Sequence, residues 1–224
     1  LMNLIRVLFD ALTGTASVVI MYLFSIISPI IVFYLEYKNI NCSEWLQIAL
    51  ARMYILFSNE RKAKEVLINI ISKYDKSYTA HKLLAEIYEK EGGMRKAIDE
   101  YVQAVDLNKQ DYDSYYKVAE LLNNLDKKEE ASEMLFNLLN KKPETYEASI
   151  LLGEILINSE MYKEAVNVYQ EALRYNPISY DLNYNLGIAY TMLNDFQNAK
   201  ICYEKAAQLN SLLYNTKYSL AEIA

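Results

Sequence analysis

Hydrophobic residues in the last four-fifths of the chain recur in short runs that are separated by polar breaks. One run consists of Leu182, Leu186, Ala189, Tyr190 and Leu193. Steps of three and four residues place such side chains on one face of an α-helix. Asn194 and Asp195 break this run, and a second run at helical spacing consists of Phe196, Ala199, Tyr203, Ala206 and Ala207. The pattern predicts two amphipathic helices joined by a short turn.

The same pair of runs returns every 34 residues. One column of small residues is Ala63, Ala97, Ala131, Ala165 and Ala199, and another is Ala51, Ala85, Ala119, Gly153 and Gly187. A third column is Tyr78, Tyr112, Tyr146, Tyr180 and Tyr214. A period of this size is typical of stacked helix–turn–helix units, which bury their apolar faces only against one another. We expect repeats over 44–77, 78–111, 112–145, 146–179 and 180–213 and a partial repeat over 214–224, with the small residues where two helices of a repeat cross and with Tyr169 and Tyr203 filling the space between repeats.

Residues 1–43 follow a different pattern. From Ala11 to Leu35 there are 25 consecutive residues without a charged side chain. As a helix they would extend roughly 37 Å, which is enough to cross a hydrocarbon core of ~30 Å. Arg6 and Asp10 precede the segment, and Glu36 and Lys38 follow it. We therefore predict an N-terminal membrane anchor over 1–43, with a helix over about 11–35 that contacts the lipid bilayer.

Other structures for this segment stay open. It could form a buried cap helix on the first repeat, and Pro29 is compatible with a membrane hairpin or an in-plane helix. A cleaved signal peptide is disfavoured because its apolar core would be shorter. More Lys and Arg residues follow the segment than precede it, and Cys42 and Cys202 are too far apart to suggest a disulfide framework. Both observations favour a single-pass membrane protein with its repeats in the cytoplasm.

Composition narrows the functional classes. The formal net charge is −6 and no basic stripe is present, which argues against a nucleic-acid partner. His81 is the one histidine and lies in no Cys/His cluster, so we expect no metal site. The sequence has no phosphate-binding glycine-rich loop and no isolated acid/base pair. We accordingly predict that the chain is not an enzyme and uses no cofactor.

Two of the repeats carry a family signature. The fifth contains Leu186, Gly187, Tyr190, Ala199, Tyr203 and Ala206, and the fourth contains Leu152, Gly153, Tyr162, Ala165, Tyr169, Ala172 and Pro177. In these residues the chain resembles the tetratricopeptide repeat family, and with its apolar N-terminal segment it is similar to the membrane-anchored bacterial members. The resemblance covers residues 44–224. It implies an all-α helix–turn–helix solenoid, a right-handed superhelix, whose concave groove binds peptides or partner proteins.

The resemblance also implies which residues line that groove, on one face of each first helix. Carried over to this chain, they are Glu86, Tyr116, Glu120, Asn123, Ile150, Glu154, Tyr184, Ile188 and Tyr218. Carboxylates flank aromatic and aliphatic side chains in this set, so an extended basic or mixed apolar and basic segment would complement it. The tyrosine column that begins at Tyr78 has two interpretations, a packed staple in the turn between repeats or a ladder of exposed rings.

We therefore expect a membrane-tethered scaffold or adaptor that binds partner proteins or extended peptides in the groove. An alternative is that the repeats form the regulatory arm of a larger enzyme, or of an envelope or secretion complex, whose other domain lies outside this chain. The sequence does not distinguish the two.

Overall fold

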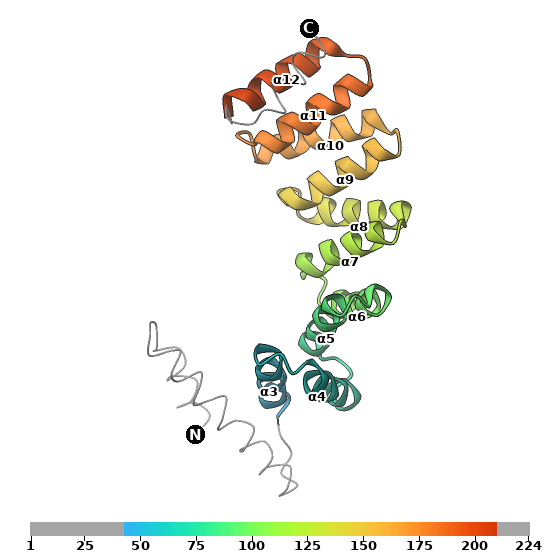
Figure 1. Ribbon diagram of the computed structural model, residues 1–224, viewed down its shortest axis with the longest axis vertical. Helices are drawn as coiled ribbons and strands as arrows, with labels where there is room; N and C mark the ends of the chain where they lie inside the picture. Colours follow the sequence, from blue (N-terminus) through green and yellow to red (C-terminus); the bar gives the residue numbers. More distant parts are fainter. Residues whose placement is uncertain (1–42, 210–224) are drawn as a thin grey trace, which may run out of the picture. The chain divides into compact units, whose positions relative to one another are not determined.

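The computed structural model describes residues 43–209, and every regular element in this range is an α-helix (Figure 1). The helices are α3 (Glu44–Leu56), α4 (Glu60–Lys73), α5 (Tyr78–Lys90), α6 (Met94–Leu107), α7 (Tyr112–Asn124), α8 (Lys128–Lys141), α9 (Tyr146–Asn158), α10 (Tyr162–Tyr175), α11 (Tyr180–Met192) and α12 (Phe196–Leu209). They form consecutive pairs in which a first helix of 13 residues is followed by a second helix of 14. The predicted all-α solenoid of helix pairs is confirmed.

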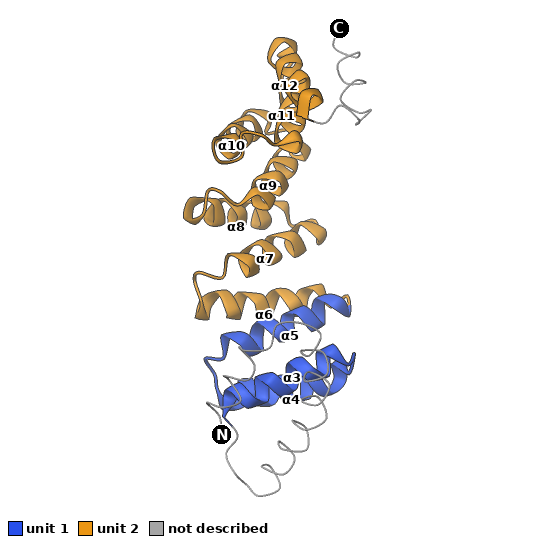
Figure 2. Ribbon diagram, turned by 90° about the vertical axis from the view of Figure 1, so that its left-hand side faces the viewer, with its two compact units in different colours: residues 1–91 blue, residues 92–224 orange. Residues whose placement is uncertain are grey.

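The helices belong to two compact units, which are coloured separately in Figure 2. The first unit spans residues 1–91 and contains α3, α4 and α5 among the described residues. The second unit spans residues 92–224 and contains α6 to α12. In the second unit each helix packs against the next one along the chain, and α9 also contacts α7 and α11. Three first helices therefore lie next to one another in this unit.

Polar residues set where the first helices begin. Ser77, Asp111 and Ser179 precede α5, α7 and α11, and each side chain accepts a hydrogen bond from the backbone N–H three residues later. Such an N-cap satisfies one of the four backbone donors that a helix start leaves unpaired. Thr145 holds the equivalent position before α9, but its hydroxyl donates to the Lys142 carbonyl instead. The 34-residue period therefore includes the polar boundary between repeats.

The turn inside each repeat has a left-handed residue at one fixed position. These residues are Ser58, Gly92, Asp126, Glu160 and Asn194, with φ between 54° and 76°. The position follows the end of each first helix, where a left-handed residue lets the chain leave the helix and start the next. Glycine adopts this conformation at no steric cost, whereas a residue with a Cβ does so at a cost. Only the second repeat has the glycine here.

The small residues occupy the closest helix contacts, as predicted. Ala119, Ala131, Ala165 and Ala199 are fully buried in the second unit. At Gly153 the approach is closest, because an added Cβ would lie 2.1 Å from Cζ of Tyr169 on α10. A Cβ added at Gly187 would likewise lie 2.5 Å from Cε1 of Tyr203 on α12. Each ring lies over the glycine of its own repeat, so the two tyrosines pack within a repeat, and their filling of the space between repeats stays a prediction.

The first unit has its own core and its own ion pairs. Its buried residues include Ile48, Leu67, Ile70, Leu84 and Ile87. Lys64 on α4 pairs with Glu91 at 2.6 Å, and Lys90 on α5 pairs with Glu60 at 2.5 Å. These pairs join the start of α4 to the end of α5. Surface ion pairs of this kind add little stability each, so burial of the apolar faces dominates.

The apolar segment over residues 11–35 lies outside the described residues. Between residues 43 and 209 no helix is long and apolar enough to cross a membrane. The membrane anchor therefore stays a prediction.

Candidate partner-binding face

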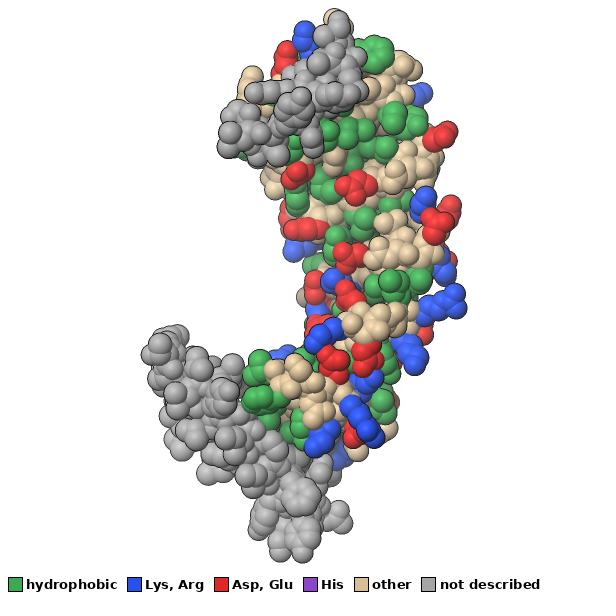
Figure 3. Space-filling model, in the orientation of Figure 1, with side chains coloured by type: hydrophobic (Ala, Val, Ile, Leu, Met, Phe, Trp, Pro, Cys, Tyr) green, Lys and Arg blue, Asp and Glu red, His purple; other side chains and the backbone are tan. Residues whose placement is uncertain are grey.

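The candidate site lies on the three neighbouring first helices of the second unit. We call it the first-helix face and define it by Tyr116 and Glu120 on α7, Glu147, Ile150 and Glu154 on α9, and Tyr184 and Ile188 on α11. Within each helix these residues are three, four or seven positions apart, so they share one side of the helix. Over the part of the second unit that contains α9 and α11, hydrophobic side chains form a patch with acidic side chains at its border (Figure 3).

The aromatic part of the face is preorganised. The rings of Tyr180 and Tyr184 stack with centroids 5.7 Å apart and planes 9° apart, and Tyr184 also contacts the ring of Tyr203 at 5.6 Å. Ile150, Tyr184 and Ile188 are half-buried. Side chains that are held in place and still partly accessible can bind a partner with little loss of side-chain entropy.

The acidic part of the face is largely uncompensated. Glu120 pairs with Lys117 at 2.9 Å, whereas Glu147 and Glu154 make no ion pair or hydrogen bond within residues 43–209. The sequences of α9 and α11 contain no lysine or arginine. Burial raises the pKa of Glu154 above its ordinary value. Glu154 is nevertheless exposed, so this partial desolvation costs the fold little and leaves the carboxylate accessible to a partner.

Tyr116 connects the acidic groups of α7 and α9. Burial raises the pKa of its hydroxyl, and the charge of Glu120 raises it further. The charge of Lys117 lowers this pKa, and Glu147 and Glu154 raise it by smaller amounts. Four carboxyl and phenol groups from two helices therefore lie within electrostatic range of one another. The arrangement favours a positively charged ligand over an anionic one.

Beneath this face lies a polar atom without a partner. Tyr169 is fully buried, and its hydroxyl has no hydrogen-bond partner in the described part of the chain. Burial raises the pKa of this hydroxyl, and the charge of Glu154 adds to the shift. In the next repeat the equivalent hydroxyl, that of Tyr203, lies 3.3 Å from Oγ1 of Thr191. The sequence predicted that Tyr169 fills the space between repeats and gave no signal that its hydroxyl would be left unpaired.

The other predicted site residues are spread more widely. Asn123 is half-buried at the end of α7, and Glu86 is exposed on α5 of the first unit. Tyr218 lies outside the described residues. The structure therefore brings six of the nine predicted residues together on α7, α9 and α11. Asn123 also lies on α7, but near the end of the helix. Glu147 was not among the nine and lies on α9 with the six.

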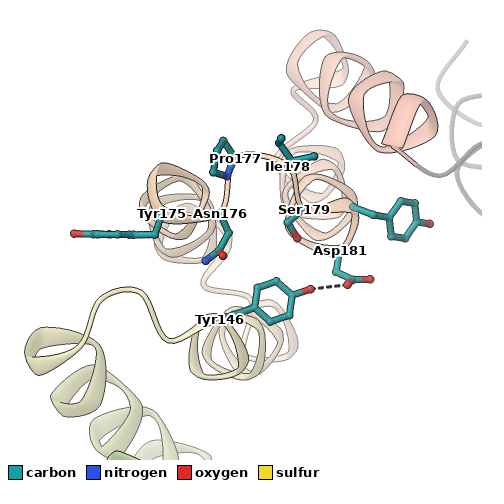
Figure 4. A pocket seen from close by; sticks show the side chains of 8 residues that line it. Tyr146, Tyr175, Asn176, Pro177, Ile178, Ser179 and Asp181 are labelled. Carbon is teal, nitrogen blue, oxygen red and sulfur yellow. Dashed lines mark hydrogen bonds between the residues drawn. The ribbon is translucent and has the colours of Figure 1, made fainter.

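The tyrosine column has a packing role rather than forming an exposed ladder. Tyr78, Tyr112, Tyr146 and Tyr180 are each the first residue of a first helix, and all four are half-buried. The Tyr146 hydroxyl donates a hydrogen bond to Asp181, and Figure 4 shows these two side chains pointing toward each other. Burial, followed by this bond, raises the pKa of Tyr146. Tyr146 and Asp181 line an open pocket of about 530 Å³, together with Tyr175, Asn176, Pro177, Ile178, Ser179 and Tyr180.

Two residues that could carry chemistry are buried instead. The side chain of His81 on α5 is buried, and so is that of Cys202 on α12. Burial raises the pKa of the Cys202 thiol to about 11. A thiol with such a pKa is almost entirely protonated at neutral pH and is therefore a poor nucleophile. Within residues 43–209 no group of His, Cys, Asp and Glu side chains could hold a metal ion.

Comparison with known proteins supports the fold. Two tetratricopeptide repeat models match the chain, one over residues 153–194 and one over residues 180–212. No curated protein matches the sequence. A solved structure of YrrB, described as a tetratricopeptide repeat protein with an unusual peptide-binding site, is similar with a TM-score of 0.69 and 18% identity, over 84% of this chain and 96% of that chain.

Two further structures have the same fold. MamA is similar with a TM-score of 0.67 and 15% identity, over 75% of this chain and 92% of that chain. PilF from Pseudomonas aeruginosa is similar with a TM-score of 0.58 and 18% identity, over 80% of this chain and 88% of that chain. At sequence identities this low, the similarity to these three solved structures establishes the fold alone.

Proposed function

We propose that this array of tetratricopeptide repeats is a scaffold that binds an extended segment of a partner protein along the first-helix face. The observation that carries the proposal is the combination of ordered, half-buried aromatic and aliphatic side chains with the unpaired carboxylates Glu147 and Glu154. Apolar anchors supply affinity, and charges at the border supply specificity and faster association. The peptide-binding site described for YrrB supports the same use of the fold.

The test is site-specific photo-crosslinking in cells. A photoreactive phenylalanine derivative replaces Tyr184 on the first-helix face, and the matched control places it at Lys200, which is exposed on the second helix α12. We expect a discrete adduct at position 184 and none at position 200. The crosslinked segment is then made as a peptide, and Tyr184→Ala should weaken its direct binding. Equal labelling at both positions, or none at either, would contradict the proposal.

We further propose that residues 11–35 tether the scaffold to a membrane, with the repeats in the cytoplasm. The absence of charge over these 25 residues supports it. The full chain should resist extraction by alkaline carbonate, and a variant without residues 1–42 should be released. Release of the full chain under the same conditions would refute the tether and leave the binding proposal standing.

A further inference from the structure

The starting observation is the unpaired hydroxyl of Tyr169. The ring begins on α10 and crosses Gly153 of α9, where an added Cβ would lie 2.5 Å from the hydroxyl oxygen. The hydroxyl therefore ends against the backbone of α9, beside Glu154, whose charge reaches it. A buried hydroxyl that donates no hydrogen bond destabilises the fold, so its retention needs a reason.

The fifth repeat shows how the fold can satisfy such a hydroxyl. There the tyrosine is Tyr203, Thr191 supplies its partner at 3.3 Å, and the residue after the glycine is Ile188. In the fourth repeat the residues 34 positions earlier are Ile157 in place of Thr191 and Glu154 in place of Ile188. The fourth repeat therefore lacks the internal partner that Tyr203 has, and it carries a carboxylate where the fifth repeat has isoleucine.

Glu154 in turn has no cation to neutralise it. It makes no ion pair within residues 43–209, and neither α9 nor α11 contains a lysine or an arginine. Tyr116 and Glu120 lie close by on α7, and Lys117 is engaged by Glu120. A positive group from outside the described residues would complement this site, and an anionic group would be repelled by Glu147 and Glu154.

We propose that Glu154 and Tyr169 form a subsite for an arginine side chain of the bound segment, which rests on the proposed binding function of the first-helix face. Tyr169 is a positioning residue: its hydroxyl donates to one oxygen of Glu154 when the carboxylate turns toward it. The other oxygen then accepts hydrogen bonds from the guanidinium group. Arginine suits the place better than lysine, because its planar donors fit a carboxylate and its face stacks on rings such as that of Tyr116.

The test uses the full-length chain in detergent micelles with 3-fluorotyrosine incorporated only at position 169. The ¹⁹F signal is followed during titration with acetyl-arginine amide, and acetyl-citrulline amide serves as the neutral control of similar shape. We expect a saturable shift with the arginine probe alone. Glu154→Gln should weaken this binding by about tenfold or more, because it removes a charge-assisted hydrogen bond. Equal shifts with both probes, or binding unchanged by Glu154→Gln, would overturn the proposal.

The fifth repeat offers a matched variant. Glu154→Ile combined with Ile157→Thr gives the fourth repeat the arrangement found at Ile188 and Thr191, so the variant should fold and bind no arginine probe. The positioning role has its own readout. Without ligand, Glu154→Gln should move the ¹⁹F signal of residue 169, and Glu147→Gln should leave it in place. A signal that neither change moves would show that the charge of Glu154 does not reach the hydroxyl, and it would refute the positioning role.

The crosslinking experiment separates this inference from the proposed function. An adduct at position 184 combined with no response to the arginine probe would refute the arginine subsite and retain the scaffold. Loss of the adduct at position 184 would refute the binding face itself, whatever the probe does.

Discussion

The contact between Gly153 and Tyr169 allows one substitution to be worked through in detail. In Gly153→Ala the new Cβ would lie 2.1 Å from Cζ and 2.5 Å from the hydroxyl oxygen of Tyr169. Carbon atoms normally approach to about 3.5–4.0 Å, so the ring or the helix must move by more than about 1 Å. Tyr169 is fully buried, so its ring is surrounded by other protein atoms and a shift of this size must displace them.

Two opposing effects set the size of the change. Alanine is favoured over glycine inside a helix by about 1 kcal/mol, and overpacking a core costs about 1–3 kcal/mol. The short distance places the overpacking cost at this site toward the upper end of that range. We therefore expect a net loss of stability of about 1–2 kcal/mol. Gly187→Ala is the matched comparison, and it should lose less because its nearest contact is 2.5 Å, to the ring of Tyr203.

The assay is hydrogen exchange of the α9 and α10 amides, followed by mass spectrometry on the full chain, because arrays of repeats need not unfold in one step. Gly153→Ala should speed exchange in both helices. Adding Tyr169→Leu should recover part of the loss, since the third repeat carries Ala119 and Leu135 at the equivalent positions. Slower exchange in Gly153→Ala than in the natural chain would refute the reasoning.

The other predictions concern the turns and Glu154. Glu160→Gly should stabilise its repeat by about 0.5–1 kcal/mol, because it removes a Cβ from a left-handed residue. Gly92→Ala should destabilise its repeat by about 1 kcal/mol for the opposite reason. Thermal unfolding followed by circular dichroism measures both changes, and a loss of stability in Glu160→Gly would contradict the reasoning. Burial raises the pKa of Glu154 above its ordinary value of 4.5, so the folded state favours the protonated group and its contribution to stability falls as pH rises through that value. Glu154→Gln should therefore slow exchange in α9 at pH 7 and have little effect well below pH 4.5; a destabilised variant at pH 7 would show that the carboxylate has a stabilising partner.

The helical architecture could be predicted because the same pattern of small and hydrophobic residues recurs in each repeat. The spacing of Ala131, Ala165 and Ala199 places a small residue wherever two helices approach closely, and all three are fully buried. The turn at Gly92 was also visible as a glycine pair. The left-handed residues Ser58 and Glu160 were not, because no sequence preference marks a serine or glutamate for that conformation.

The candidate site was predictable only in part. Helical spacing indicates which side of α9 carries Ile150 and Glu154. It does not reveal that the ring of Tyr169 crosses Gly153 and leaves its hydroxyl beside Glu154, since this depends on how closely α9 and α10 approach. The hydrogen bond from Tyr146 to Asp181 likewise joins two repeats and appears in neither one alone.

Within each unit, the helices contact only their near neighbours along the chain. Within residues 43–209, no two helices from distant repeats of one unit make an extensive contact. A pull applied to the two ends would therefore pass through every repeat in series, and the weakest would give way first while its neighbours stayed folded. Each 34-residue repeat would release about 110–120 Å of extended chain as it opened. Between a fixed point and a bound partner, such an array would lengthen in steps under load.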